Sequence, residues 1–351
     1  MIWQKVNKMD ISASAVKLHR ESVVIDPCVQ YLTEKTERTD KSGLTAVGIT
    51  VPGVGDDYFD AIDRVKGFYR VIADNPSFCM GNTVEAIRQA HTEGKLAHIF
   101  GAQNSLMIGS DPGNLILWKQ MGLTFCQLTY NEKTLAGSGC IELNDDGISQ
   151  FGKVLVREMS RVGVTLDLSH VGERTFMQAV EVAQAPVLVS HSNPKAVVDN
   201  PRNITDDQMK AVADTGGIIC VTTWAPLIYR GGDQMPTLDD YLVCLEYALE
   251  LVGIDHVGTS TDSMGTMGAY PPHDFSDDDL PYHLVTDPLD KNANPPDTNN
   301  RQPSDFNGIE DYPYLTHKLL ERGYSEEEVK KILGENLMRV FEQTLKPNLL
   351  V

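Results

Sequence analysis

Short apolar runs alternate with amphipathic segments along most of this chain. The runs are four to eight residues long and rich in β-branched side chains, a pattern that is typical of buried strands. Eight such runs occur, at residues 22–26, 44–51, 96–101, 123–129, 164–170, 186–191, 218–222 and 256–262. We therefore expect eight strands, spread over the first three quarters of the chain.

The segments between the runs carry apolar residues at helical spacing. Residues 147–162 are an example, with Phe151, Leu155, Met159 and Val162 on one face. The same pattern, together with capping residues at Thr205 and Ser325, predicts helices at 12–20, 57–73, 83–93, 115–121, 172–183, from 205 onward, 238–252, 314–322 and 325–343. Strands that alternate with helices in this way predict an α/β fold, a (β/α)8 TIM barrel, formed by one domain over residues 1–351.

One long segment falls outside this alternation. Residues 263–313 are rich in Pro, Asp and Asn and are too long for a bare connection. We expect a loop or lid over the barrel mouth after the eighth strand, followed by the two C-terminal helices.

Composition narrows the classes of partner and setting. The 351 residues are 41% hydrophobic and 23% charged, which is ordinary for a globular protein. A formal net charge of −19 argues against nucleic acid or an anionic membrane surface as a partner. The six cysteines form no CxxC pair, no run of about 18 apolar residues occurs and no signal-peptide pattern opens the chain, so we expect a cytoplasmic protein. A homo-oligomer is compatible with the sequence.

The ends of the predicted strands carry the candidate chemistry, because a barrel places its reacting groups there. Two successive strands end in Ser-His, at His170 and His191, and the eighth ends at Asp262. A single histidine on an apolar strand is more often a hydrogen-bonded core residue. Two of them followed by an aspartate favour a metal site. Cys28, after the first strand, is either a small buried residue or a further ligand.

Other residues near the mouth are open to two interpretations. Arg202 follows the sixth strand and is either a bidentate clamp for a carboxylate or a solvated arginine. Four aromatic residues either line a pocket or fill space beneath the lid: Tyr130, Trp224, Tyr229 and Tyr270. The three histidines of the lid and the terminal helices are not expected to be ligands: His273, His283 and His317.

The ordered motifs are similar to those of a known family. Leu166-Asp-Leu-Ser-His170-Val, Val189-Ser-His191-Ser, Pro201-Arg202-Asn203 and the strand end at Asp262 resemble the membrane (renal) dipeptidase family of metallopeptidases, an amidohydrolase-like barrel family. The resemblance implies two zinc ions bridged by a glutamate. By the same resemblance, His170 and His191 would bind one ion, Asp262 would bind the other and shuttle protons, and Arg202 would hold the substrate carboxylate.

The chain departs from that pattern at three important places. Where the family has His-x-Asp after the first strand, this chain has Cys28 and Gln30. Gln103 stands in place of the bridging glutamate, and Tyr130 in place of a histidine that would touch the substrate carbonyl. Because an amide cannot bridge two cations as a carboxylate does, we expect one metal ion or none.

Three functional hypotheses follow. The first is a hydrolase that holds a single zinc ion and acts on a dipeptide or small amide bearing a carboxylate. Its metal ligands would be His170, His191 and Asp262, with Cys28 or water completing the set. Its other roles would be Asp262 as general base, Tyr130 as hydrogen-bond donor to the carbonyl, and Arg202 and Gln103 at the substrate. The second is a catalytically degenerate small-molecule binding protein. The third is a hydrolase or lyase of altered, non-peptide specificity.

Overall fold

A parallel sheet of eight strands forms the centre of the molecule. The computed structural model describes residues 10–30, 32–53, 55–265 and 301–346. The strands follow the order β1-β2-β4-β5-β6-β7-β8-β9. Their bounds are β1 Ile25–Val29, β2 Ala46–Thr50, β4 Leu96–Ala102, β5 Leu123–Gln127, β6 Thr165–Asp167, β7 Leu188–Ser192, β8 Ile218–Thr222 and β9 Val257–Ser260.

The last strand returns to the first. A parallel bridge joins Val29 to Ser263, and the backbone N–H of Gln30 donates to the carbonyl of Ser263 at 2.8 Å. The buried carboxylate of Asp26 in β1 reinforces this seam by accepting hydrogen bonds from Ser260 and Thr261. The predicted (β/α)8 barrel is therefore confirmed, with all eight predicted strands present.

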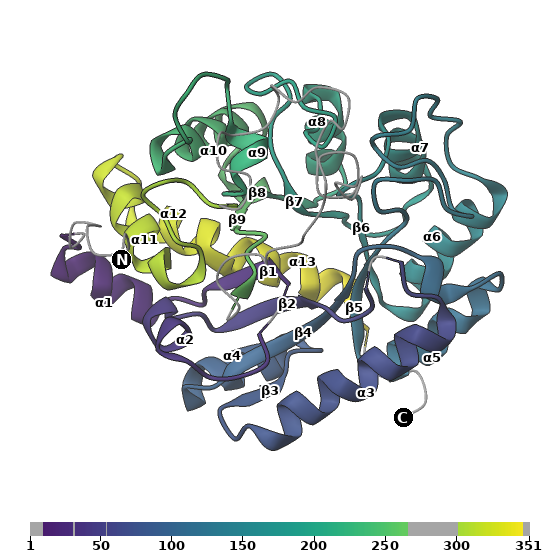
Figure 1. Cartoon of the computed structure of the whole chain (residues 1–351), viewed down its shortest axis with the longest axis horizontal. Helices are drawn as coiled ribbons and strands as arrows, with labels where there is room; N and C mark the ends of the chain where they lie inside the picture. Colours follow the sequence, from purple (N-terminus) through teal and green to yellow (C-terminus); the bar gives the residue numbers. More distant parts are fainter. Residues whose placement is uncertain (1–9, 31, 54, 266–300, 347–351) are drawn as a thin grey trace.

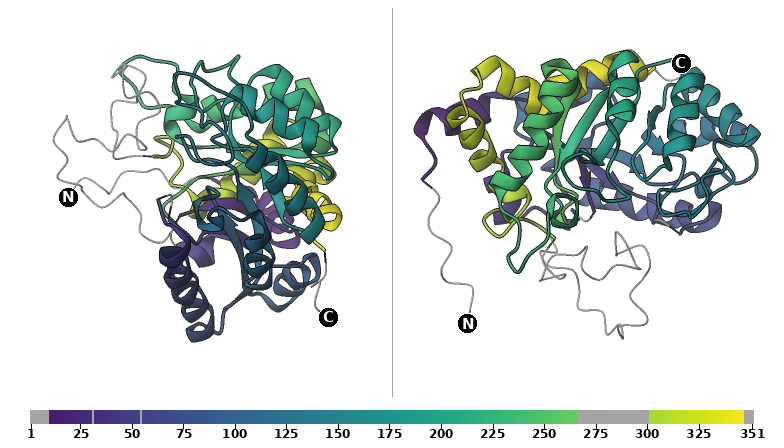
Figure 2. Two further views of the ribbon diagram at one scale, coloured as in Figure 1. Left: turned by 90° about the vertical axis from the view of Figure 1, so that its right-hand side faces the viewer. Right: turned by 90° about the horizontal axis from the view of Figure 1, so that it is seen from above.

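Helices surround the strands on the outside (Figures 1 and 2). They are α1 Ala13–Glu21, α2 Glu37–Ser42, α3 Tyr58–Asp74, α4 Val84–Glu93, α5 Leu115–Gln120, α6 Gln150–Val162, α7 Glu173–Val182, α8 Asp206–Asp214, α9 Ala225–Ile228, α10 Leu238–Val252, α11 Tyr312–Glu321, α12 Glu326–Lys330 and α13 Asn336–Thr344. Among the described residues, none of these helices is long and apolar enough to cross a membrane.

The elements that the sequence pattern missed are short. The strand β3 (Phe78–Met80) pairs with β4 beside the barrel path, and α2 and α9 span six and four residues. The predicted helix 325–343 contains a π-helical turn, Lys331–Glu335, between α12 and α13. At Gly334 in that turn, a Cβ would lie 2.3 Å from the carbonyl oxygen of Val23, two residues before β1, so only glycine allows this close approach.

The helix caps follow the sequence closely. Thr205 and Ser325 each form the expected capping box, with Gln208 and Glu328 as the reciprocal partners. The cap of α4 is Thr83, whose hydroxyl accepts from the backbone N–H of residue 86.

The C-terminal helix closes one end of the barrel. Apolar side chains of the strands pack with Leu337 and Phe341 of α13 inside a single buried cluster. Thr344 in the same helix is hydrogen-bonded to Thr165, at the start of β6, at 2.6 Å. Because this end is filled, the opposite end, where the strands terminate, is the one available for a site.

The predicted lid is described only in part. Residues 266–300, which include Tyr270, His273 and His283, lie outside the described residues. Gln302, just after them, donates to the Thr261 carbonyl at 2.8 Å and accepts from the Thr223 hydroxyl at 2.6 Å. These two bonds attach the end of the segment to the C-terminal ends of β8 and β9. A lid over the mouth remains a prediction.

Buried His19 makes the stability of the fold sensitive to acid. Its ring contacts Thr316 of α11 at 2.7 Å and the Ser42 carbonyl at 2.8 Å. Burial lowers its pKa from 6.5 to about 4, so the unfolded chain binds the proton first. The resulting stability is present above pH 6.5 and is lost between pH 6.5 and about 4.

We expect the free energy of unfolding to fall by about 2 kcal/mol from this histidine alone when the pH is lowered from about 7.5 to about 4.5. Urea unfolding in EDTA at the two pH values measures the loss. His19→Gln, which keeps an N–H donor and cannot titrate, should show a drop smaller by that amount. Asp26 acts in the opposite direction, because burial raises its pKa to about 6. An equal drop in both proteins would exclude His19 as the cause.

Candidate metal centre

Two of the predicted ligand residues adopt a backbone conformation that side chains disfavour. Among the described residues, His170 and Asp262 are the only non-glycine positions with positive φ, at 68° and 48°. This left-handed region costs free energy for residues with a Cβ and is kept mainly where the surrounding structure requires it. Both residues follow the ends of their strands, and both side chains are nearly fully buried.

The two histidines meet ring to ring. Nε2 of His170 lies 2.8 Å from Nε2 of His191. The other nitrogen of His170, Nδ1, lies 2.6 Å from the Oδ1 of Asn131 and must donate to it. Nδ1 of His191 lies 2.7 Å from the Ser190 hydroxyl, which itself donates to the Asp167 carboxylate and so accepts from the ring.

These partners place the ring protons on the outer nitrogens of both histidines. The two Nε2 lone pairs therefore face each other across 2.8 Å, an arrangement that is repulsive until a cation lies between or beside them. Two imidazoles on one zinc ion stand about 3.3 Å apart, so the pair needs only a small opening to bind it. Burial lowers the pKa of both rings, to about 4 for His191, which keeps them neutral and able to coordinate.

A second group of potential ligands adjoins His191. Cys28, His191 and Asp262 each offer a ligand atom, and these atoms all lie within 4.8 Å of one another. The Cys28 thiol donates to Oδ1 of Asp262 at 3.2 Å. Cys28, His191 and Asp262 thus fit one divalent cation, with sulfur, nitrogen and oxygen donors from three strand ends.

Amide groups occupy the rest of this side of the pocket. Nε2 of Gln30 donates to Asp262 at 2.8 Å, and Nε2 of Gln103 donates to the Cys28 sulfur at 3.2 Å and to the Thr50 hydroxyl at 2.8 Å. Both glutamines therefore present N–H donors to the candidate ligands. A second cation here would meet amide hydrogens rather than carboxylate oxygens.

Arg202 is buried beside the histidine pair with part of its guanidinium unused. Its Nη2 donates to the His191 carbonyl at 3.1 Å, and the side chain is 2% exposed. Its Nε and Nη1 are buried and have no hydrogen-bond partner among the described residues. A buried charged donor without a partner is costly, so these two N–H groups indicate a place for an anionic ligand.

Aromatic residues border the same space. The ring of Tyr130 stacks on His170 with centroids 4.0 Å apart. Burial, with Asp262 nearby, raises the pKa of this tyrosine, so it retains its proton. Trp224, just after β8, has a buried indole N–H with no partner in the described part of the chain. The guanidinium of Arg301 lies over its ring, 5.4 Å from the centroid.

The structure brings most of the predicted site residues together. His191, Asp262 and Cys28 form one group, and His170 faces His191 with Tyr130 stacked on its ring. Arg202 contacts His191, and Gln103 contacts Cys28. His317 is elsewhere, on α11, 3.3 Å from Glu321. The residues that orient the rings were not expected from the sequence: Asn131, Ser190 and Asp167. The polar Asp167 inside an otherwise apolar strand was the available signal for them.

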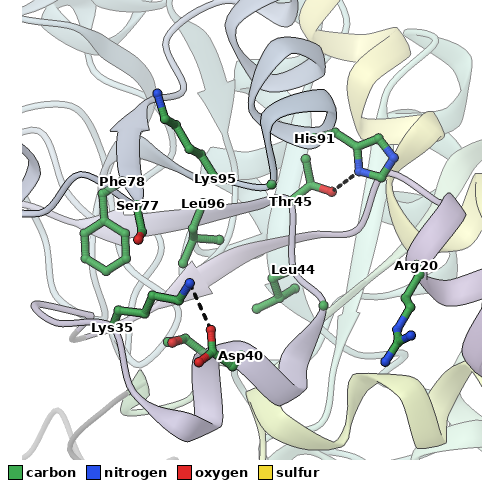
Figure 3. Close-up of a pocket in the computed structure, with 13 residues that line it drawn as sticks. Arg20, Lys35, Asp40, Leu44, Thr45, Ser77, Phe78, His91, Lys95 and Leu96 are labelled. Carbon is green, nitrogen blue, oxygen red and sulfur yellow. Dashed lines mark hydrogen bonds and ion pairs between the residues drawn. The ribbon is translucent and has the colours of Figure 1, made fainter.

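A separate cavity of about 220 Å³ lies at the other end of the barrel (Figure 3). Thr45 and Leu96, at the starts of β2 and β4, contribute to its lining. Its two lysines are already paired, Lys35 with Asp40 at 3.1 Å and Lys95 with Glu93 at 2.9 Å. This cavity therefore lies apart from the candidate ligands, from the positive-φ residues and from Arg202, which are all at the C-terminal ends of the strands.

Comparison with known proteins places this geometry in context. The sequence matches the family model described as membrane dipeptidase (peptidase family M19) over residues 5–290 and 293–348. It is also similar to the crystal structure of an amidohydrolase from Pseudomonas aeruginosa, with 32% sequence identity and a TM-score of 0.82. That match covers 94% of this chain and 99% of the other.

Two more distant structures share the fold. The probable dipeptidase PvdM from Pseudomonas aeruginosa is 18% identical, with a TM-score of 0.78 over 94% of this chain and 97% of the other. A metallo peptidase from Rhodobacter sphaeroides is 19% identical, with a TM-score of 0.75 over 92% of this chain and 99% of the other. That protein is liganded with a phosphinate mimic of the dipeptide L-Ala-D-Ala.

Proposed function

This chain belongs to the membrane dipeptidase family, peptidase family M19, and from that premise we propose that it hydrolyses a dipeptide or small amide at a site holding one zinc ion. Membership makes it a dipeptidase-like metallohydrolase. The single ion, the identity of the metal, the substrate and the residue roles are our proposal.

The observation that carries the proposal is the pair of converging lone pairs on His170 and His191. Asn131 and Ser190 fix both rings in the ligating tautomer, as outer partners do in metal sites. We assign Asp262 as the third ligand, and this mixed set of donors suits zinc. When bound, the ion supplies a Lewis acid for the scissile carbonyl and lowers the pKa of water.

One ion rather than two is supported by the two glutamines. Gln30 donates an N–H to Asp262, and Gln103 donates one to Cys28. A second divalent ion would need carboxylates at these positions to balance its charge. We further propose that Gln103 borders the substrate, with its amide held by Cys28 and Thr50.

The remaining roles belong to side chains around the histidines. Arg202 binds the substrate carboxylate through Nε and Nη1, which satisfies its two unpartnered donors. Tyr130 keeps its proton and donates a hydrogen bond to the carbonyl oxygen as negative charge develops there. Asp262 accepts the proton of the attacking water.

Metal content and turnover test the proposal together. Purified protein supplied with zinc should retain about one equivalent after dialysis and hydrolyse members of a dipeptide panel, starting with L-Ala-D-Ala. Less than about 0.2 equivalents would contradict the zinc site, since three-ligand sites normally hold their ion. Thermal stabilisation by dipeptides without turnover in zinc-loaded protein would contradict hydrolysis and favour a binding function.

A substitution behind the metal ligand gives a second test. Asn131→Leu removes the oxygen that fixes the His170 tautomer but keeps a side chain of similar shape. We expect the zinc dissociation constant to rise about 10- to 100-fold, as for other outer-shell partners of metal ligands. Competition with a chromophoric chelator measures it. Unchanged affinity in a folded variant would mean that Asn131 does not orient the ligand.

A further inference from the structure

We propose that the thiolate of Cys28 is a ligand of the cation. This inference rests on the single-ion site proposed above and assigns it a sulfur donor. The chain has a cysteine and a glutamine at positions where the resembled family pattern has a histidine and an aspartate, and the site thereby changes the chemical class of one of its ligands.

The position of the sulfur supports this role. Cys28 is 2% exposed, and its Sγ belongs to the group of ligand atoms from Cys28, His191 and Asp262 that lie within 4.8 Å of one another. The residue lies in β1, the strand adjoining the seam with β9, so its approach to Asp262 is fixed by the closed barrel rather than by a loop. A metal ion coordinated by His191 and Asp262 would have this sulfur as a neighbour.

The hydrogen bonds around the sulfur fit both of its protonation states. The thiol donates to Oδ1 of Asp262 at 3.2 Å, and Nε2 of Gln103 donates to the sulfur, also at 3.2 Å. Gln103 is in turn held by the Thr50 hydroxyl at 2.8 Å. An N–H donor aimed at sulfur stabilises the thiolate, so the site keeps a partner for Cys28 after its proton has left.

Charge balance gives an independent reason. His170 and His191 are neutral ligands, and both glutamines that face the site are neutral as well. Asp262 then supplies one negative charge against the two positive charges of the cation. A Cys28 thiolate supplies the second, which makes the coordinated group neutral in a buried place where net charge is costly.

Binding exchanges the proton of the Cys28 thiol for the cation. The S–H bond of Cys28 breaks, its electron pair stays on sulfur and becomes the bond to the metal, and the proton passes to Oδ1 of Asp262 and from there to solvent. One proton is released for this ligand, and no electron is transferred. A thiolate also favours zinc, cobalt and cadmium over the harder magnesium and manganese ions.

Cobalt spectroscopy tests the ligand without measuring activity. Co²⁺ is added to the full-length, metal-depleted protein, and bound cobalt is counted on the same sample. We expect a near-ultraviolet sulfur-to-cobalt charge-transfer band in the wild type, with retained cobalt but no such band in Cys28→Ser. Cys244→Ala, which changes a buried cysteine of α10, should keep the band.

The outcomes separate this inference from the proposed function. If the wild type binds cobalt without a charge-transfer band, or if the band persists in Cys28→Ser, the sulfur ligand is wrong while the metal site remains. If no cobalt or zinc binds, both are wrong. Because the wild-type spectrum is decisive by itself, a failure of the variant to fold does not remove the test; Cys28→Ala then serves as the second variant.

Discussion

His191→Ala is expected to lower bound zinc from about one equivalent to below about 0.1 and to slow hydrolysis by at least about 1,000-fold. His191 belongs to both ligand groups, because it faces Nε2 of His170 at 2.8 Å and shares the 4.8 Å cluster with Cys28 and Asp262. Its removal leaves no adequate ligand set. Elemental analysis after dialysis measures the metal, and steady-state kinetics on the best dipeptide measures the rate.

His91→Ala is the matched control for this substitution. His91 is a partly buried histidine at the opposite end of the barrel, where its Nδ1 lies 3.2 Å from the Thr45 hydroxyl (Figure 3). The control should keep both zinc and activity. If His191→Ala retained a full equivalent of zinc, or if both variants lost it equally, the site at the strand ends would be wrong.

Arg202→Met is expected to raise KM about 100-fold for substrates with a free carboxylate, with a smaller change in kcat. The guanidinium has two buried N–H groups that no described residue pairs with, and a substrate carboxylate is the ligand that would satisfy both. Because binding to a remote carboxylate acts similarly in the ground and transition states, the loss should appear mainly in KM. Kinetics on a dipeptide and on its C-terminal amide separate the effects.

The amide substrate is the internal control. It lacks the carboxylate, so the wild type should already use it poorly, and Arg202→Met should affect it little. Arg202→Lys keeps the charge but not the planar fork and should recover only part of the affinity. The methionine variant should be no less stable than the wild type, because it removes a buried, incompletely paired charge. Equal losses on both substrates would assign Arg202 a structural role instead.

The fold was predictable because its signals are local. Apolar runs such as 218–222 reveal strands by composition, and the helical spacing of Leu155, Met159 and Val162 reveals the buried face of α6. The short elements β3 and α2 were missed, because neither carries a clear apolar pattern. The π-helical turn at Gly334 was also beyond prediction, because it depends on contact with β1, about 300 residues earlier in the chain.

The candidate site was predictable only as a set of residues. A barrel brings strand ends together, so His170, His191 and Asp262 could be grouped from their positions alone. Their chemistry could not be predicted, because the tautomer of each histidine depends on its hydrogen-bond partner. That partner is Asn131 for His170 and Ser190 for His191. From sequence spacing alone, Arg202 could be either a clamp for a carboxylate or a solvated residue. In the structure it is buried, and two of its N–H groups have no partner among the described residues.

By itself the sequence determined the alternation of strands and helices, the two Ser-His strand ends, and the presence of glutamines at positions 30 and 103. Only the tertiary structure decided that two Nε2 lone pairs face each other and that Cys28 contacts Asp262, 234 positions away. The reason is physical. Residue type and period are properties of the chain, while the direction of a side chain at a strand end depends on strand register, backbone strain and barrel closure, which distant residues impose.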